Sequence, residues 1–291
     1  MALLPAPSAL RTVEIISFLA DHPDKVYAVA DLARRVGQSR ATCQAVLLAL
    51  EPSRWVVRTK GGYALGAGLI SIGAAAQQGT AIVGLLRAAV GELHEHTGCE
   101  ILGYLPAGDR LINVSRVGPT GPGTITMVEG QAFPLAPPNG LAFAAWDERD
   151  LELWLGRATT ADRTAPDNLR KAAQIVRELG YSVLLDPLTR RELKTNVDSL
   201  SAARQKFVAS ALAHHDLVVQ EDEATGAMRV SLLSSPVFGS DGKVCALIGL
   251  VFDVRQYGDL AELVTALKAA CRQLSERLGA PPVPALKDQP A

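Results

Sequence analysis

The chain has 291 residues, of which 48% are apolar and 20% are charged. This composition is that of a globular protein, and the length allows two domains of roughly 100–200 residues each. No apolar run approaches the ~18 residues that cross a bilayer, and the first residues lack a basic segment followed by an apolar core. The four cysteines are far apart, which argues against a disulfide framework or a zinc cluster and favours a reducing compartment. Secreted, membrane and collagen-like proteins are thereby excluded, and we expect a cytoplasmic protein.

Basic residues are concentrated near the start of the chain. Residues 1–79 contain six Arg and two Lys against three Asp and two Glu, whereas the whole chain has a formal charge of −1. Between Arg34 and Lys60, six basic residues are accompanied by a single acid, Glu51. Such a segment is typical of a module that binds a polyanion. A solvated helix face has the same composition, so the order of the predicted elements must decide between the two.

The first two predicted elements are helices. Ser8 is expected to cap a helix whose apolar residues recur at helical spacing as far as Leu19, before His22-Pro23-Asp24 breaks it. A second, short helix is predicted over residues 29–36. Gly37 ends it in a tight turn, because glycine adopts a positive φ without steric cost.

A third helix and a hairpin follow. Ser39 is placed to cap a helix over residues 40–51, and Pro52 limits its extension. Two β-prone runs, residues 55–58 and 63–65, flank Lys60-Gly61-Gly62 and predict a β-hairpin. Helix, short helix, glycine turn, helix and hairpin is the order of a winged helix-turn-helix.

In a winged helix-turn-helix, the third helix enters the DNA major groove and the wing contacts the backbone. Arg40 suits a guanine edge and Gln44 an adenine edge. The predicted phosphate contacts are Ser39, Thr42, Arg58 and Lys60. The alternative roles are a plain helix cap for Ser39, an exposed filler for Thr42 and hairpin solubility for the two wing residues.

The recognition segment resembles that of a known family. Gly37–Leu47 aligns without a gap with Gly-Leu-x-Lys-Ser-Thr-Val-x-Arg-Leu-Leu of the isocitrate-lyase regulator (IclR) family of bacterial transcription factors, and Tyr63-Ala64-Leu65-Gly66 matches the end of its wing. The resemblance covers residues 8–73. Ala45 stands where the family has an arginine, so an operator preference is not implied.

The second half resembles the same family more weakly. Residues 130–135 with 139–144, and 234–238 with 241–244, are similar to family segments. The resemblance implies a GAF-like effector domain, with helices on one face of an antiparallel sheet and a ligand cavity on the other. The expected effector-binding residues are Asn139, Gly140, Leu141, Leu232, Ser234, Gly249 and Val251.

The departures from the family concern this cavity. Leu232, Gly249 and Val251 stand where effector-binding members often have Cys or Ser. Fewer donors favour an effector more apolar than pyruvate or glyoxylate, because a buried charge needs hydrogen-bonding partners. The alternative is a cavity filled by side chains, with no ligand. Roughly thirty residues between Asp186 and Glu221 are an insertion relative to the family, within which residues 204–214 are predicted to form a helix.

The expected fold class is α+β. A winged helix-turn-helix over residues 8–66 is joined by a linker helix, residues 67–79, to a GAF-like domain over residues 80–278 with an insertion at about 187–220. A disordered tail is expected over residues 280–291, which contain four of the chain's prolines.

No motif predicts catalysis, a metal or a cofactor. His94 and His96 are two residues apart on a predicted helix and therefore point to different faces. The predicted function is a DNA-binding transcriptional regulator, a cytoplasmic repressor that is not an enzyme. Its expected partners are double-stranded DNA with a palindromic operator, a small-molecule effector and a second copy of the chain, as homodimer or homotetramer. Two alternatives stay open: a DNA-binding module fused to an enzymatic domain, and a ligand-independent dimeric DNA-binding protein.

Overall fold

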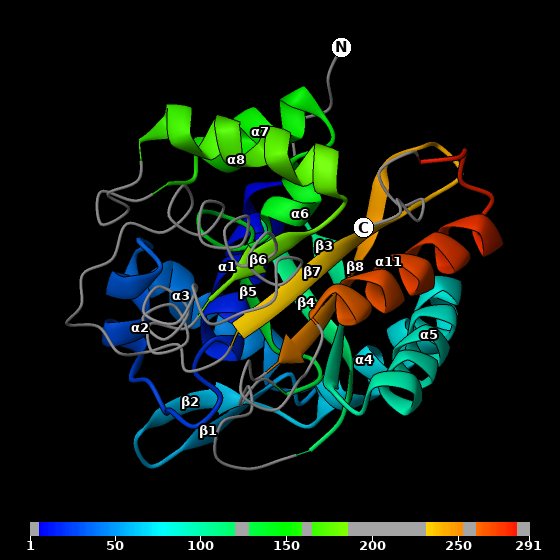
Figure 1. Ribbon diagram of the computed structural model, residues 1–291. Coiled ribbons are helices and arrows are strands. Elements are labelled where there is room, and N and C mark those ends of the chain that lie inside the picture. The colour runs from blue at the N-terminus through cyan, green and yellow to red at the C-terminus, as the bar shows by residue number, and fades with distance from the viewer. Residues whose placement is uncertain (1–5, 120–127, 159–164, 186–230, 253–259, 284–291) are drawn as a thin grey trace. The chain divides into compact units, whose positions relative to one another are not determined.

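The computed structural model describes residues 6–119, 128–158, 165–185, 231–252 and 260–283 (Figure 1). The chain divides into two compact units, residues 1–81 and 82–291. In the described residues no single helix is long and apolar enough to cross a membrane. Only two successive helices, α4 (Gly68–Gly79) and α5 (Ala81–Thr97), reach that length and composition together, and they are separated by a break.

The first unit contains four helices and a hairpin among its described residues. Its elements are α1 (Pro7–Ala20), α2 (Val29–Arg35), α3 (Arg40–Leu50), β1 (Val56–Thr59), β2 (Gly62–Leu65) and α4 (Gly68–Gly79). The predicted winged helix-turn-helix is therefore confirmed. Ser8, expected to cap the first helix, instead lies inside α1, which begins at Pro7. Proline suits the first helical position because its missing N–H is not needed there.

The core of this unit is built from one face of α1, α2, α3 and the hairpin, whereas α4 contributes no buried residue. α1 contributes Ile15 and Leu19, α3 contributes Cys43 and Leu47, and the hairpin contributes Tyr63, all buried. Leu10 and Val13, which share the apolar spacing of α1, are 48% and 61% exposed. The buried stripe of α1 is therefore shorter than the sequence spacing indicates.

The second unit is a six-stranded antiparallel sheet with helices. Its elements are α5 (Ala81–Thr97), β3 (Glu100–Ala107), β4 (Arg110–Val117), β5 (Ala132–Pro134), α6 (Leu141–Ala144), α7 (Glu148–Leu155), α8 (Pro166–Leu179), β6 (Ser182–Leu184), β7 (Ser231–Phe238), β8 (Val244–Phe252) and α11 (Leu260–Arg277). The strand order is β5-β4-β3-β8-β7-β6. The predicted α+β class is confirmed.

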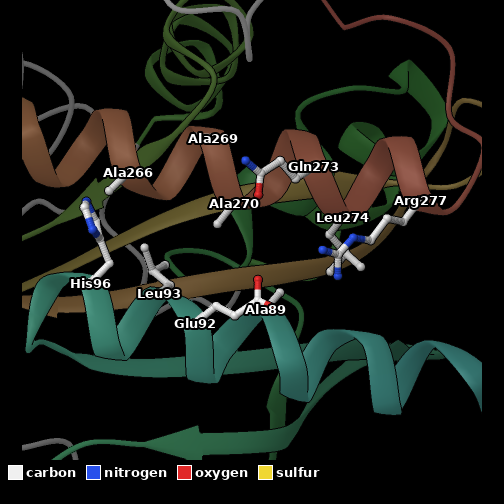
Figure 2. Close-up of a pocket in the computed structure, with 10 residues that line it drawn as sticks. All are labelled: Ala89, Glu92, Leu93, His96, Ala266, Ala269, Ala270, Gln273, Leu274 and Arg277. Atoms are coloured by element: carbon white, nitrogen blue, oxygen red, sulfur yellow. The ribbon is translucent and has the colours of Figure 1, made fainter.

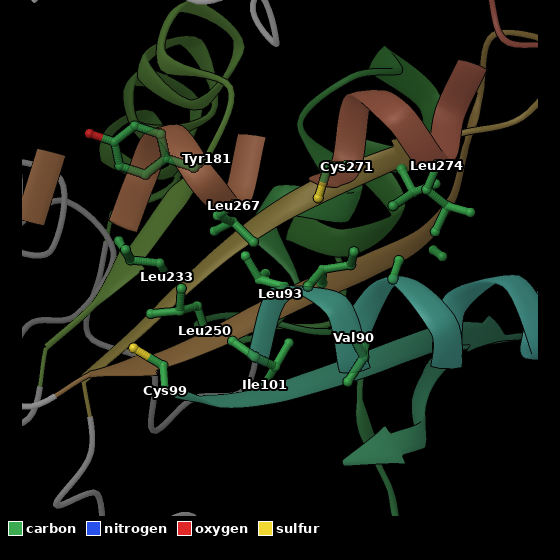
Figure 3. Close-up of a cluster of buried hydrophobic side chains, with 14 of the residues drawn as sticks. Val90, Leu93, Cys99, Ile101, Tyr181, Leu233, Leu250, Leu267, Cys271 and Leu274 are labelled. Atoms are coloured by element: carbon green, nitrogen blue, oxygen red, sulfur yellow. The ribbon is translucent and has the colours of Figure 1, made fainter. Parts of the chain in front are cut away.

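Helices cover both faces of this sheet, which corrects the prediction of helices on one face. On one face α5 and α11 pack against the strands, as Figure 3 shows for Leu93 and Leu267 above Leu250. On the other face α6, α7 and α8 pack over Leu102 and Leu247. Both faces of the central strands are apolar, so each needs a cover.

Several predictions fall at or beyond the limits of the described residues. The insertion at about 187–220, with its predicted helix over 204–214, lies outside them. Ala280 and Val283, at the start of the predicted tail, pack against the core. The described part of the chain thus extends to Val283, and residues 284–291 lie outside it.

Candidate DNA-binding surface and effector face

The N-terminus of α3 is built by a turn and a cap. Gly37 has φ = 65°, and Ser39 adopts an extended conformation from which its Oγ accepts the backbone N–H of Thr42 at 3.1 Å. The hydroxyls of Ser39 and Thr42 are 2.8 Å apart. These contacts satisfy one N–H of the first turn of the helix, which begins at Arg40.

The six predicted DNA-binding residues differ in exposure. Ser39, Arg40, Arg58 and Lys60 are exposed, whereas Thr42 and Gln44 are half-buried. The amide nitrogen of Gln44 lies 3.5 Å from the hydroxyl of Tyr63 on β2, which holds this side chain toward the hairpin. The positive charges are therefore available to a polyanion, while Gln44 must turn away from Tyr63 to reach a base.

The wing is a two-stranded hairpin attached to a third segment. β1 and β2 pair from Val56↔Leu65 to Thr59↔Gly62. The backbones of Tyr27 and Tyr63 exchange two hydrogen bonds, of 3.0 and 2.8 Å. This bridge holds β2 next to the turn of the hairpin, where Tyr63 pairs with Arg58. It thereby supports the end of the wing that carries Arg58 and Lys60.

Two more basic residues lie at the end of α2. Arg34 and Asp31 form an exposed ion pair, and the guanidinium of Arg35 lies over the ring of Tyr27 at 5.5 Å. The ring of Tyr27 also packs edge-on against Phe18. The basic segment of the sequence contains both arginines. The contact of Arg35 with the ring of Tyr27 is a tertiary contact, and no local pattern in the sequence indicates it.

The predicted effector residues of β7 and β8 lie on one face of the sheet. Leu232 pairs with Val251 and Ser234 with Gly249, and opposite residues of an antiparallel pair share a face. A Cβ on Gly249 would lie 3.1 Å from Leu232 and from Tyr104. The structure thus brings these four residues together beneath α6 to α8.

The other three predicted effector residues lie at the start of α6. Gly140 has φ = 79°, and a Cβ there would lie 2.3 Å from Leu135. The carbonyl of Asn139 accepts a 2.6 Å hydrogen bond from the indole N–H of buried Trp154. Leu141 is buried in the same cluster. Packing explains the conformation of this turn, and a role in ligand binding stays a prediction.

The face of the sheet that carries Leu232, Ser234, Gly249 and Val251 is called the effector face below. Sequence reasoning missed two buried polar side chains on it. Tyr104 of β3 pairs with Asn113 of β4 and with Leu247 of β8. Asn113 is fully buried; its Oδ1 accepts the N–H of Ser115, and its Nδ2 has no hydrogen-bond partner among the described residues. The signal available was an amide in the otherwise apolar run Leu111–Val114.

Tyr104 supplies a second donor to this face. Burial, together with the nearby Glu100 carboxylate, raises the pKa of Tyr104 above its usual value. The phenol therefore stays protonated at neutral pH and can donate a hydrogen bond. Its ring packs edge-on against Phe133.

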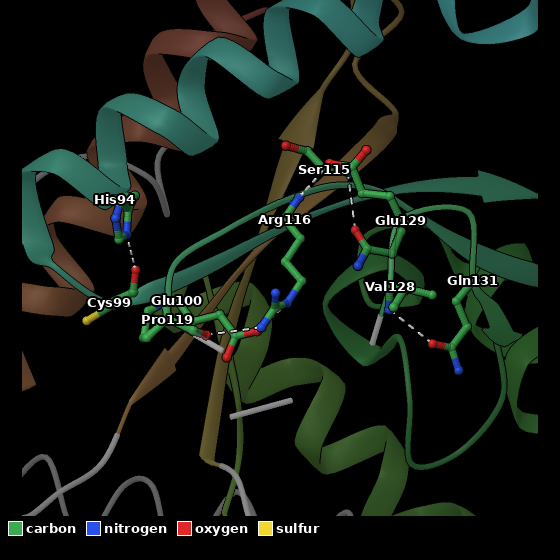
Figure 4. Close-up of polar contacts among 10 residues, drawn as sticks. His94, Cys99, Glu100, Ser115, Arg116, Pro119, Val128, Glu129 and Gln131 are labelled. Atoms are coloured by element: carbon green, nitrogen blue, oxygen red, sulfur yellow. Dashed lines mark hydrogen bonds and ion pairs between the residues drawn. The ribbon is translucent and has the colours of Figure 1, made fainter. Parts of the chain in front are cut away.

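A buried ion pair closes the end of β3 and β4. The Nε of Arg116 donates to Glu100 at 2.7 Å, and the two side chains are only 17% and 2% exposed. The same guanidinium donates to the carbonyl of Pro119 (Figure 4). Arg116 pairs with Leu102, which places it on the effector face, but its donors are already engaged.

A separate groove of about 230 Å³ runs between α5 and α11 (Figure 2). Its lining combines four alanines and two leucines with four polar or charged side chains: Ala89, Glu92, Leu93, His96, Ala266, Ala269, Ala270, Gln273, Leu274 and Arg277. None of the predicted effector residues lies in it. The groove belongs to the helices that cover the opposite face of the sheet, so it is distinct from the effector face.

The comparisons with known proteins fit this two-domain architecture. No family model matches the sequence, and no curated protein matches it. Among solved structures, the chain is similar to an IclR transcriptional regulator from Alicyclobacillus acidocaldarius, with 23% identity, a TM-score of 0.66 and coverage of 94% of this chain and 99% of that one. An IclR-type regulator from Silicibacter sp. TM1040 has 20% identity, a TM-score of 0.70 and coverage of 97% and 100%.

A third similar structure contains a ligand. It is an IclR homologue from Microbacterium hydrocarbonoxydans complexed with 4-hydroxybenzoate, with 14% identity, a TM-score of 0.59 and coverage of 93% and 98%. The class of protein that the fold defines is thus a winged helix-turn-helix followed by an antiparallel α+β domain. More particularly, the chain has the fold of the IclR transcriptional regulators, which confirms the fold that the sequence resemblance implies.

Proposed function

We propose that the protein is a transcriptional regulator of the IclR type that binds duplex DNA through α3 and the wing and senses a small molecule in its second unit. The observation that carries this proposal is the exposed Arg40 at the start of a capped helix, next to an exposed basic hairpin, within a winged helix-turn-helix. Arginine at that place can read a guanine edge, while Arg58 and Lys60 neutralise phosphates. As the sequence analysis predicts, we propose that the regulator is a cytoplasmic repressor without enzymatic activity.

A homodimer or homotetramer on a palindromic operator is part of this proposal. One recognition helix reads few base pairs, so two copies related by two-fold symmetry gain affinity and specificity together. In the described part of the chain, no residue of α4 is buried. The helix has no charged residue, and its Ile70 is 73% exposed. A second copy is the partner that would cover such an apolar helix.

The proposed effector has an apolar body and one hydrogen-bond acceptor. Leu102, Leu232 and Val251 supply an apolar wall. The Nδ2 of Asn113 and the hydroxyl of Tyr104 are donors on the same face, and an acceptor on the ligand would satisfy the buried amide. Because Arg116 is engaged by Glu100, its guanidinium is not available to a small carboxylate such as pyruvate or glyoxylate. Two alternatives, an enzymatic second unit and a ligand-independent dimer, remain rivals to this proposal.

The DNA-binding proposal is tested by selecting duplexes from a randomised pool. We expect a two-fold symmetric sequence to be enriched, and Arg40→Ala to weaken binding to it by about tenfold to a hundredfold, the value of one good base contact. Arg40→Lys keeps the charge but loses the planar fork, so it should lose specificity while keeping its salt dependence. Lys60→Ala should weaken binding to all duplexes and lower the salt slope by about 1.

The result that contradicts the proposal is equally direct. If no sequence is enriched and no duplex is retained at low salt, the protein is not a DNA-binding regulator. If Arg40→Ala and Lys60→Ala act identically on selected and random duplexes, Arg40 contacts phosphate and not a base.

The effector proposal is tested by ligand-induced thermal stabilisation. We expect apolar ligands with one acceptor, such as aromatic or medium-chain ketones, to raise the Tm, and glyoxylate and pyruvate to leave it unchanged, since a ligand that binds the folded state stabilises it. Asn113→Leu should abolish the shift, and Tyr104→Phe should reduce it. Leu153→Ala, an exposed position on α7, is the control. A shift with pyruvate at low concentration, or a full shift in Asn113→Leu, contradicts the proposal.

A further inference from the structure

The outward face of α3 is apolar along its length. Positions 41, 45 and 48 lie at helical spacing, and Ala41, Ala45 and Leu48 are exposed, with Leu48 at 52%. The opposite stripe, including Cys43 and Leu47, is buried in the core. Between Arg40 and Glu51 the helix contains no charged residue. We name Ala41, Ala45 and Leu48 the apolar ridge.

The polar residues beside the ridge are largely committed elsewhere. The Thr42 hydroxyl contacts Ser39, and the Gln44 amide is held toward Tyr63. A surface that enters the major groove would therefore present one guanidinium, from Arg40, and then three apolar side chains. Apolar side chains read one feature of that groove, the C5 methyl group of thymine.

The surroundings of the ridge indicate which partner covers it. Arg40, Arg58 and Lys60 are exposed in the same unit, and the segment from Arg34 to Lys60 contains one acid against six bases. A second copy of the chain that covered the ridge would bring its own cations close to these three positive charges. Duplex DNA instead offers phosphates for the cations and thymine methyl groups for the ridge. The charge therefore favours DNA over a second copy at this face.

We infer that Ala41, Ala45 and Leu48 contact thymine methyl groups, so that each operator half-site combines a guanine for Arg40 with neighbouring A·T pairs read by the ridge. This inference rests on the proposed function and specifies its base preference. Leu48, two turns into α3, is the specificity-determining residue farthest from Arg40.

The test replaces thymine by uracil, one position at a time, in the duplex selected from the random pool. Uracil keeps every hydrogen-bonding group and lacks only the methyl group. We expect affinity to fall about 4-fold at each contacted thymine, the effect of burying one methyl-sized group, and to stay unchanged at thymines outside the half-sites. In Ala45→Gly and Leu48→Ala, with folding checked by circular dichroism, the effect at one thymine each should disappear.

The outcomes separate this inference from the proposed function. Enrichment of a sequence in which every thymine tolerates uracil overturns the thymine readout and leaves the regulator standing. Absence of any enriched sequence overturns the proposed function itself. A Leu48→Ala variant that changes the oligomeric state, with uracil sensitivity intact, assigns the ridge to contact between copies and also overturns the inference.

Discussion

Gly62→Ala is expected to disrupt the wing and abolish DNA binding. Gly62 has φ = 141°, a conformation that other residues rarely adopt, and a Cβ there would lie 2.1 Å from the carbonyl oxygen of Tyr27. The atom it meets is backbone, and that backbone holds the hairpin through the Tyr27–Tyr63 bridge. The strain and the overlap together cost about 3 kcal/mol or more, which is large for a unit of about 75 residues.

Gly61→Ala is the matched control for this prediction. Its Cβ would lie 3.5 Å from a methyl carbon of Val26, an ordinary contact, and its φ is not in the positive range. We expect Gly61→Ala to bind the selected duplex as the parent does, while Gly62→Ala loses the cooperative unfolding transition of the first unit. Equal stability and binding in the two variants would show that the bridge does not hold the wing.

The fold of the first unit could be predicted from the sequence because its signals are local. Gly37 ends α2 and Ser39 caps α3 within a few residues of the elements they define, and Lys60-Gly61 makes a two-residue hairpin loop. Such signals act through backbone conformation and do not depend on the rest of the chain. Their limit is visible at Ser8, where proline at the preceding position starts α1 one residue earlier.

The effector face could be predicted only in part because its geometry is set between distant strands. The family resemblance implies that Leu232 and Val251 belong to the cavity, but the pairing of Val251 with Leu232 and with Glu100 of β3 depends on sheet register. Asn113 faces Tyr104 because β4 has an irregular register beside Gly103, and such a shift reverses which face later residues occupy. The packing of α6, α7 and α8 over this face also depends on contacts between segments distant in sequence, so local patterns do not predict it.

The second large effect is expected at the buried ion pair of the second unit. Arg116→Met removes the ion-pair partner of the Glu100 carboxylate, whose side chain is 2% exposed. A carboxylate left in such a place without its cation is costly, so we expect the free energy of unfolding of the second unit to fall by about 3 kcal/mol. Urea denaturation, followed by the fluorescence of buried Trp154 in the same unit, measures this change.

A double-mutant cycle shows whether the Arg116–Glu100 pair stabilises the fold or mainly offsets the free-energy cost of burying the Glu100 charge. Glu100→Gln removes the charge and keeps the shape, so Glu100→Gln combined with Arg116→Met should be more stable than Arg116→Met alone. We expect a coupling energy of about 1–3 kcal/mol from the complete cycle. Additive losses would show that Arg116 acts through its bond to Pro119 and its packing instead. If Arg116→Met kept its stability but lost the thermal shift caused by ligand, Arg116 would be a ligand contact, and the proposed effector would have to be an anion.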